Sequence, residues 1–440
     1  MCVRKAWGGK AARLAGCLLS FGYGGCGAAV VPPGDAGSPS TLNLSALGFD
    51  AIPTHVETTS NNLLDVAESA DATRAPQVIR GGISGTDDVD VYDLGPIVPG
   101  DRVLVSVTTD PSLEAAVALF DDTGASLLIN DHRNVYLGRS GPFVDVVIRR
   151  ESPSCLVAFS ATPGYASQGE YVLGASVEFP MPIPNSRSDV VLLDFGRARG
   201  VQVGNRPAMD IPPFDAADID AAYAGRTERL VAELVARVRE DFAGYNVTIL
   251  STTEGATDDG TMSRVHFGTF DEALLGVAEG VDEYNALDAQ EAMVFTDTFA
   301  AFSPLDPSVT EMAQALANVA SHEIGHLLGL VHTSDAVDLM DVTASLRELL
   351  EDQNFARAPI YAAVFPLGDQ DSVQSLLDSV GGDPEVARGK PRRLAERDWG
   401  DLRYLKRMPA RATLRLSRCG HGGRSHSEPL DSSRAEAPMP

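Results

Sequence analysis

The stretch that decides the fold of the second half of the chain reads SHEIGHLLGLVH and occupies residues 321–332. Upstream of it, Ser308 and Glu311 have the spacing of a helix capping box, and apolar residues then recur every three or four positions. This pattern predicts one long helix that enters the stretch. Residues four apart lie one turn above each other, so His322 and His326 should share a face of that helix.

Three histidines in this stretch have the spacing of a metal site. His322 and His326 can both direct a ring nitrogen at one Zn²⁺ ion, at about 2.1 Å. Gly329 can leave the right-handed helical region, so the chain can double back and bring His332 to the third ligand position. Glu323 then stands beside a fourth position that is open to water, where it would act as general base. All required offsets are met within one window, which makes an accidental match the poorer explanation.

The sequence DLMD follows at residues 338–341. The extended histidine motif with a downstream methionine resembles the metzincin zinc metalloproteases, and most of all their matrixin-type members. Over roughly residues 189–380, the resemblance implies a larger upper half-domain above a smaller lower one, a polypeptide substrate, and Met340 as an apolar floor beneath the metal. Two features depart from it. Val342 replaces a tyrosine that some metzincins carry, and no cysteine of a matrixin-like latency motif precedes the domain, so a thiol switch is not expected.

The remainder of this region predicts an α+β domain with a mostly parallel sheet. By apolar pattern, a long amphipathic helix is expected over 218–242, and shorter helices over 345–350 and 373–380. Strands are expected over 190–195, 247–249, 265–270 and 292–295. In metzincins an edge strand pairs with the extended substrate, and by analogy we assign that role to 265–270. An ordinary strand inside the sheet is the equally plain alternative.

Residues 76–180 have a different pattern, with short alternating strands bounded by turn residues, which is typical of an all-β sandwich. This part resembles the bacterial pre-peptidase C-terminal domain in four short motifs, at residues 85–92, 99–101, 119–121 and 169–173. It departs from that family because it precedes the catalytic region instead of following it. The acidic side chains of Asp87, Asp88 and Asp90 would suit a Ca²⁺ ion, or would simply be solvated turn carboxylates.

The N-terminus has the features of a targeting segment. Four basic residues precede an uncharged run from Leu14 to Val31. We expect a signal peptide over 1–26, either of lipoprotein type with a lipid anchor at Cys26 or cleaved by an ordinary signal peptidase. The third alternative, a retained membrane anchor of about 18 residues, is disfavoured by the five glycines in the run. The protein would then be exported, as a secreted or cell-surface protein. The other expected boundaries are a linker or pro-segment at 27–75, the β-sandwich at 76–180, the catalytic domain at 189–381 and a basic, disordered tail at 382–440.

Charge and cysteine content exclude several classes of partner and site. The net charge is −26, and residues 27–380 hold 18 basic against 53 acidic side chains. Such a surface would repel nucleic acids and anionic membranes, so the only expected membrane contact is the lipid at Cys26. Three of the five cysteines lie in the targeting segment, so no disulfide framework is expected. We expect a monomer.

The sequence therefore predicts a multidomain protein, an all-β sandwich followed by an α+β metzincin-like zinc protease domain. Its function would be that of a zinc-dependent endopeptidase acting on polypeptides outside the cytoplasm. The principal alternative is a surface binding protein in which the zinc site is structural and has no catalytic role. Hydrolysis of a non-peptide amide at the same metal is a third reading that the sequence does not exclude.

Overall fold

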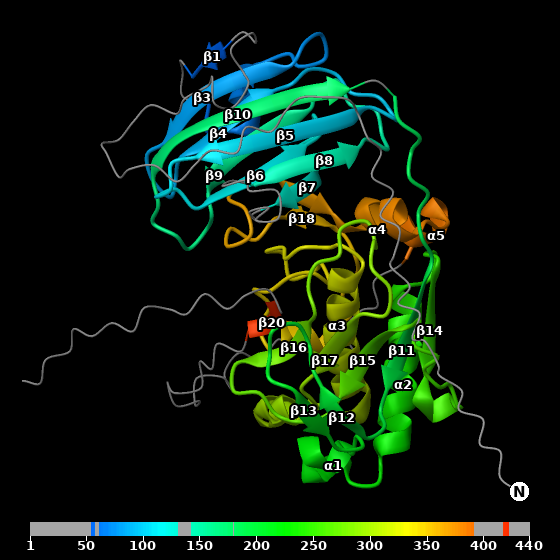
Figure 1. The fold of residues 1–440 in the computed structure, drawn as a ribbon. Helices are drawn as coiled ribbons and strands as arrows, with labels where there is room; N and C mark the ends of the chain where they lie inside the picture. The colour runs from blue at the N-terminus through cyan, green and yellow to red at the C-terminus, as the bar shows by residue number, and fades with distance from the viewer. Residues whose placement is uncertain (1–53, 58–60, 131–141, 179, 391–416, 422–440) are drawn as a thin grey trace, which may run out of the picture. The chain divides into compact units, whose positions relative to one another are not determined.

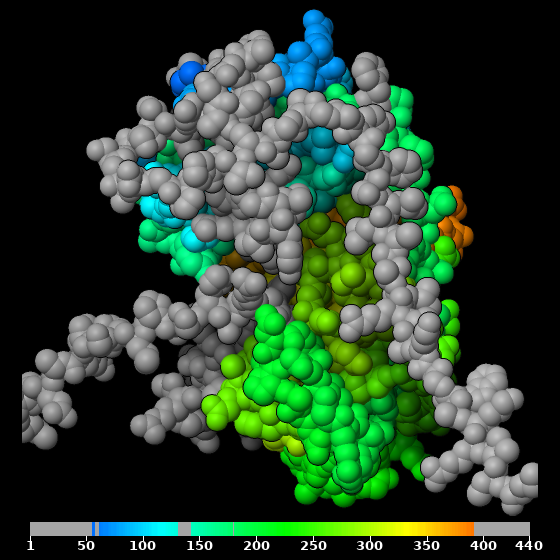
Figure 2. Space-filling view, in the orientation of Figure 1, coloured from blue at the N-terminus to red at the C-terminus, as the bar shows by residue number. Residues whose placement is uncertain are grey.

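The computed structural model describes residues 54–57, 61–130, 142–178, 180–390 and 417–421. Figures 1 and 2 draw the remaining residues in grey. The expected signal peptide, Cys26 and the first part of the linker lie outside this description. All of the described residues belong to one compact unit, Ile52–Pro440. No helix within the described ranges is both long enough and apolar enough to span a bilayer.

Two five-stranded sheets make up the N-terminal domain (Figure 1). In spatial order, the first sheet contains β1 (Thr54–Val56), β3 (Gln77–Ile83), β10 (Gly169–Glu178), β5 (Arg102–Thr109) and β8 (Phe143–Val147). The second contains β2 (Glu68–Ser69), β4 (Val89–Asp93), β9 (Leu156–Ala161), β6 (Ala115–Phe120) and β7 (Ser126–Asn130). Apart from the parallel pairs β1–β3 and β2–β4, neighbouring strands run antiparallel. The expected β-rich domain is thus present.

Side-chain alternation explains how this domain is packed. In β5, the three valines at period two are buried together with residues of both sheets in one apolar cluster. The strands β6 and β9 behave differently, because every residue in them is buried. Their alternate residues enter a second cluster that also contains Ile360 and Phe365 from the C-terminal part of the chain. The second sheet is therefore covered on both faces.

The domain begins earlier than expected, since part of the expected linker is ordered. A 3-10 helix, η2, spans Leu64–Val66, and β2 pairs with β4. The side-chain amide of Asn61, which is fully buried, donates to the carbonyl of Val91, whose own N–H donates to the carbonyl of Asn61. The expected linker or pro-segment at 27–75 is therefore part of the folded domain at residues 54–57 and 61–75. The polar side chain of Asn61 hydrogen-bonds to the backbone of a strand instead of facing solvent.

A six-stranded sheet is the centre of the C-terminal domain. Its order is β14 (Val247–Ser251), β11 (Asp189–Asp194), β15 (Ser263–Phe267), β17 (Glu291–Val294), β16 (Leu274–Ala278) and β20 (Ser417–His421). The first four strands are parallel, β16 runs antiparallel to β17, and β20 runs parallel to β16. Two smaller sheets pair β12 (Ala198–Val201) with β13 (Met209–Ile211), and β18 (Arg357–Pro359) with β19 (Asp369–Asp371). The mostly parallel sheet is as predicted.

Helices α2 and α3 pack against each other and against this sheet. The helical elements are α1 (Ala216–Ile219), η4 (Ala221–Tyr223), α2 (Thr227–Asp241), η5 (Thr252–Glu254), η6 (Thr296–Leu305), α3 (Val309–Leu327), η7 (Glu348–Leu350), α4 (Ser372–Val380) and α5 (Pro384–Arg388). The single helix expected over 218–242 is wrong at its start. Asp215 and Asp220 each cap a separate short helix. Gly225 has a positive φ of 72°, which breaks the helical conformation just before α2 begins.

The strand expected over 265–270 is β15, and it does not lie at an edge. It ends at Phe267 because Gly268 and Thr269 both have positive φ. β15 lies between β11 and β17 (Figure 1), so both of its backbone edges are already paired. The proposed substrate role of this strand is therefore wrong. Beyond the four parallel strands, next to β17, lies β16, a strand that the sequence pattern did not reveal.

The expected tail is ordered in two places. In α5, Ala387 packs against Gly244, and further on Lys390 pairs with Asp241, a carboxylate that is almost fully buried. Farther along, β20 joins the sheet. The expectation of a disordered tail from 382 is therefore wrong for residues 382–390 and 417–421. In the first of these segments, Lys390 supplies the cation that the buried carboxylate of Asp241 needs. The other residues of the tail lie outside the description.

Candidate metal centre

Helix α3 positions the first two histidines. Its start is fixed by the predicted capping box, in which the Glu311 N–H donates to Ser308 Oγ at 3.2 Å and the Ser308 N–H donates to Glu311 Oε2 at 2.7 Å. The helix is buried along nearly its whole length. Its two histidines, His322 and His326, are both fully buried. A buried helix is a rigid support, since packing on all sides restricts its side chains to few rotamers.

Gly329 makes the sharp turn that the sequence predicts. Its φ is 99°, and the N–H groups of Gly329 and Leu330 donate to the carbonyls of His326 and Gly325, which closes the helix. A Cβ atom at position 329 would also lie 2.9 Å from the carbonyl oxygen of Asp282. Only glycine meets both conditions. The chain then reverses and returns with His332.

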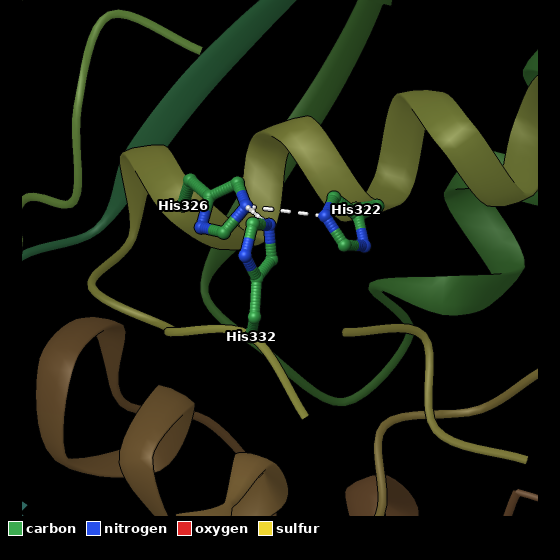
Figure 3. A group of neighbouring side chains, drawn as sticks. All are labelled: His322, His326 and His332. Atoms are coloured by element: carbon green, nitrogen blue, oxygen red, sulfur yellow. Dashed lines mark hydrogen bonds between the residues drawn. The ribbon is translucent and has the colours of Figure 1, made fainter. Parts of the chain in front are cut away.

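The three predicted ligands come together in space (Figure 3). His326 Nε2 lies 3.1 Å from His322 Nε2 and 3.1 Å from His332 Nε2. The imidazole rings meet at centroid distances of 4.7 to 5.3 Å. His332 is 8% exposed, and the other two rings are not exposed at all. Three ring nitrogens therefore converge on one buried point.

Hydrogen bonds on the far side of two rings set their tautomers. His322 Nδ1 lies 2.7 Å from the carbonyl oxygen of Leu339, and His326 Nδ1 lies 2.7 Å from that of Leu330. A carbonyl only accepts, so Nδ1 carries the hydrogen and the Nε2 lone pair faces the centre. Lone pairs this close repel each other unless a cation lies between them. Tetrahedral zinc with bonds of about 2.0–2.1 Å separates its nitrogen ligands by about 3.4 Å, so the three residues fit this ion.

Glu323 follows the first histidine and is fully buried. Strand β16 passes close to it, because a Cβ atom on Gly276 would overlap the carboxylate of Glu323. Glycine at position 276 thus gives the acid its space. The sequence pattern did not identify Gly276, and the isolated glycine within an apolar run was the one signal that could have done so.

Met340 lies against the turn of α3 that carries the two histidines. Its side chain is fully buried, and a Cβ atom on Gly325 would lie 2.5 Å from its sulfur. The N–H of Thr333, next to His332, donates to the carbonyl of Met340 at 2.9 Å. Met340 therefore contacts the helix and binds the returning chain, the position that the metzincin resemblance implies for an apolar floor.

Asp338 is a buried acid near the centre that sequence reasoning passed over. It accepts from Thr333 Oγ1 at 2.7 Å, from the N–H of Ala356 at 3.0 Å and from Ser372 Oγ at 3.2 Å. Burial raises the pKa of its carboxyl group to about 7. Asp338 thus binds together the loop after His332, the segment before β18 and the start of α4. Its place in the DLMD sequence was the available signal.

The remaining candidate residues take other roles. Among the residues that the structure describes, the three histidines are the one group of three or more His, Cys, Asp and Glu side chains close enough to share an ion. The candidate calcium site at Asp87, Asp88 and Asp90 is not such a group. Asp90 turns inward and accepts from Tyr171, whereas Asp88 accepts from Ser84.

The other histidines are not brought to the centre where the structure shows their side chains. His266 is buried beside Glu291, and His55 pairs with Glu68. The side chains of His132, His421 and His426 lie outside the description.

Comparison with known families agrees with this geometry. Residues 253–355 match the family model of the matrixins, peptidase family M10. This segment of the chain is matrixin-like. It includes all of α3, the three histidines, Glu323 and Met340. The matrixin match supports zinc as the metal and a metallopeptidase as the general class of protein.

The solved structures similar to parts of the chain include a pre-peptidase C-terminal domain and an archaemetzincin. One is the pre-peptidase C-terminal domain of a collagenase from Bacillus anthracis, at 12% identity and a TM-score of 0.19, covering 29% of this chain and 96% of that one. The other is archaemetzincin from Methanopyrus kandleri, at 14% identity and a TM-score of 0.22, covering 39% of this chain and 89% of that one. No curated protein matches the chain.

Proposed function

We propose that the chain is a zinc-dependent endopeptidase that acts on extracytoplasmic polypeptides, with Glu323 as general base. One observation carries the proposal. Three buried Nε2 atoms converge within the matrixin-like segment, and a buried glutamate directly follows the first of them. Three nitrogen ligands leave a fourth position for water, which is the ligand set of catalytic zinc sites and not of closed structural ones.

The residues of the chain supply the remaining steps of hydrolysis. When bound, zinc would polarise the scissile carbonyl and lower the pKa of a water molecule to about 7. Glu323 takes a proton from that water as it attacks the carbonyl carbon, and then gives the proton to the departing amine. The peptide C–N bond breaks, and the products are a carboxylate and an amine. The hydrogen bonds from Nδ1 of His322 and His326 hold these rings at fixed orientation throughout.

Substrate binding is proposed along β16 instead of β15. β16 is the strand that lies against Glu323, through Gly276. An extended polypeptide that added to this strand would present its backbone next to the base. Main-chain hydrogen bonds would supply affinity for many sequences, and side-chain preference would depend on pockets that the residues after His332 help to form.

The proposal also includes export, the role of the N-terminal domain and the absence of nucleic-acid partners. The basic N-terminus and the uncharged run after it support export, with a lipid anchor at Cys26 as one outcome. The two-sheet domain would be a β-sandwich accessory module in a monomeric protein. The net charge of −26 supports a protein without nucleic-acid partners.

The test is zinc content and cleavage of a denatured polypeptide, measured on the wild type and on Glu323→Ala. Both are measured on the full chain and on a form that ends at Lys390, because β20 lies on the proposed substrate strand. We expect about one zinc per chain in both proteins and cleavage in the wild type alone. If both proteins bind zinc and neither cleaves in either form, the alternative of a binding protein with a structural zinc site takes its place.

A further inference from the structure

His332 depends on a different kind of support from the two helical histidines. Its carbonyl accepts from the N–H of Tyr361 at 2.9 Å, and the N–H of Ser334 donates to the carbonyl of Pro359 at 3.0 Å. On its other side, the Gln370 amide accepts from the Val331 N–H at 2.7 Å and donates to the Val331 carbonyl at 2.9 Å. The carbonyl of the third ligand and the backbone on both sides of it, at Val331 and Ser334, are thus bound to the region of β18 and β19.

The β18–β19 pair is in turn bound to the N-terminal domain. The N–H of Asp369 donates to the carbonyl of Gly124 at 2.9 Å. Arg357 donates to the hydroxyl and the carbonyl of Thr123, at 3.0 and 2.5 Å, and its Nε donates to Asp369 at 3.0 Å. One guanidinium therefore connects β18, β19 and the β6–β7 turn.

Apolar packing strengthens this connection. The segment between β18 and β19 places Phe365 against Phe120 of β6, with ring centroids 5.9 Å apart, and both rings are fully buried. Gly368 has a φ of 82°, and a Cβ atom there would overlap the ring of Phe120. Ile360 joins the same cluster on the outer face of the second sheet. This arrangement explains why β6 and β9 are buried at every position.

We propose that the N-terminal domain positions the third metal ligand. Phe120 and Thr123 hold β18, β19 and the loop between them, and these segments hold the backbone on both sides of His332 through Gln370 and Tyr361. The domain is then a structural component of the metal centre and more than an accessory module. The inference goes beyond the proposed function but does not need it, because it concerns metal retention and not catalysis.

The test measures how fast zinc passes from the full chain to a chelator. Phe365→Ala and Gln370→Ala alter two separate links of the connection. The control is Phe159→Ala, which empties a buried site in the N-terminal domain, in a different cluster, where Phe159 packs on Tyr171. The loss of a residue that orients a ligand weakens metal binding by about 10- to 100-fold, so both test variants should release zinc at least about tenfold faster than the wild type. The control should unfold at a lower temperature yet release zinc at the wild-type rate below that temperature.

Two results would overturn the inference. One is release at the wild-type rate from both Phe365→Ala and Gln370→Ala. The other is equally fast release from Phe159→Ala, which would mean that general destabilisation is the cause. Repeating the series in the Glu323→Ala background keeps the outcome separate from the question of catalysis, since that variant has no general base.

A separate observation concerns the outer edge of β16, where the proposed substrate would bind. In the structure this edge is paired with β20, and the register joins Leu274 to Ser417, Gly276 to Cys419 and Ala278 to His421. Because Gly276 is the residue that gives Glu323 its space, β20 pairs with β16 at the point where this strand lies against Glu323. The low exposure of the three histidines and of Glu323 accords with a covered site.

Charge favours this pairing. Residues 381–440 carry 13 basic and 8 acidic side chains, whereas residues 27–380 are strongly acidic. Attraction between the two raises the local concentration of the tail at the domain. Since the tail is part of the same chain, it also binds with the advantage of a tethered ligand.

We infer that residues 417–421 occupy the substrate edge of β16 and keep the peptidase inactive until they are displaced or removed. This inference rests on the proposed function. In its test, the full chain, the form ending at Lys390 and the full-length Gly420→Pro variant are compared for cleavage of a denatured polypeptide. Proline removes a backbone N–H and disfavours a strand. The shortened form and Gly420→Pro should cleave at least about tenfold faster than the full chain, as expected when a tethered competitor is lost. Equal rates in all three would overturn the inference.

A binding measurement separates this inference from the proposed function. A labelled peptide of residues 412–426 is titrated into the Glu323→Ala form that ends at Lys390, which has no general base and lacks β20. The peptide should bind, and a peptide with Gly420 replaced by proline should bind at least about tenfold more weakly, since strand addition needs its main-chain hydrogen bonds. Equal affinity of the two peptides, or no binding of either, would overturn the edge occupancy whether or not the chain is a peptidase.

Discussion

The two sides of the metal centre are built in different ways. His322 and His326 lie on one buried helix, where a spacing of four residues alone brings their rings together. His332 lies on a returning loop whose position depends on Met340, Asp338 and the β18–β19 pair. The helical side is therefore local in sequence, and the loop side is assembled from distant segments and from a second domain. Metal binding requires both.

The largest effect should come from removing a helical ligand. We expect His326→Ala to weaken zinc binding by more than about 100-fold, since even residues that only orient a ligand contribute 10- to 100-fold. Zinc content after dialysis measures this. His266→Ala is the matched control, because His266 is equally buried but pairs with Glu291 away from the centre. If His326→Ala retained zinc, His326 would not be a ligand of the metal.

The next effect should come from the residue that joins the two sides. Gly329→Ala places a side chain at positive φ, which costs about 1–2 kcal/mol, and also forces Cβ against the Asp282 carbonyl. Both stability and zinc affinity should fall. Gly255→Ala is the control. Gly255 has a φ of 86° but no atom near the position of a Cβ, so this variant should incur only the cost of the positive φ and not that of a clash. Equal unfolding free energies of the two variants would show that the turn tolerates a side chain.

Substitutions of Met340 test whether its side chain only fills space or whether its sulfur also affects zinc binding. Met340→Ala should lower the free energy of unfolding by about 2–5 kcal/mol through the cavity it leaves. Met340→Leu keeps the volume and should cost less than about 1.5 kcal/mol. Denaturant unfolding of the zinc-loaded proteins measures both. If Met340→Leu loses zinc while remaining stable, the sulfur has a role beyond filling space.

The last prediction concerns pH and the N-terminal domain. Burial raises the pKa of Asp90 from 3.8 to about 7. Between pH 4 and 7 the folded state therefore holds a proton that the unfolded state has released, so the contribution of Asp90 to stability falls as pH rises through this window. Asp90→Asn should remove this part of the pH dependence. Melting temperatures of the two proteins at pH 5 and pH 8 test this, and an identical decline in both would contradict it.

The sequence predicted the local side of the centre well and the distant side poorly. The helix, its capping box, the turn at Gly329 and the convergence of the three histidines follow from spacing within one short stretch. Asp338 and Gln370 were missed because their bonds join segments that only tertiary structure brings together. The assignment of the edge strand to residues 265–270 was wrong for the same reason. Strand order in a sheet is set by long-range pairing, and β16 and β20 leave little trace in hydrophobic periodicity.

The most direct test of the account is X-ray absorption spectroscopy of zinc bound to the form that ends at Lys390. We expect three imidazole nitrogens and one water oxygen around the ion, and the same spectrum from Glu323→Gln. A fourth ligand from the protein would close the position that hydrolysis needs, and would contradict a catalytic role for this centre.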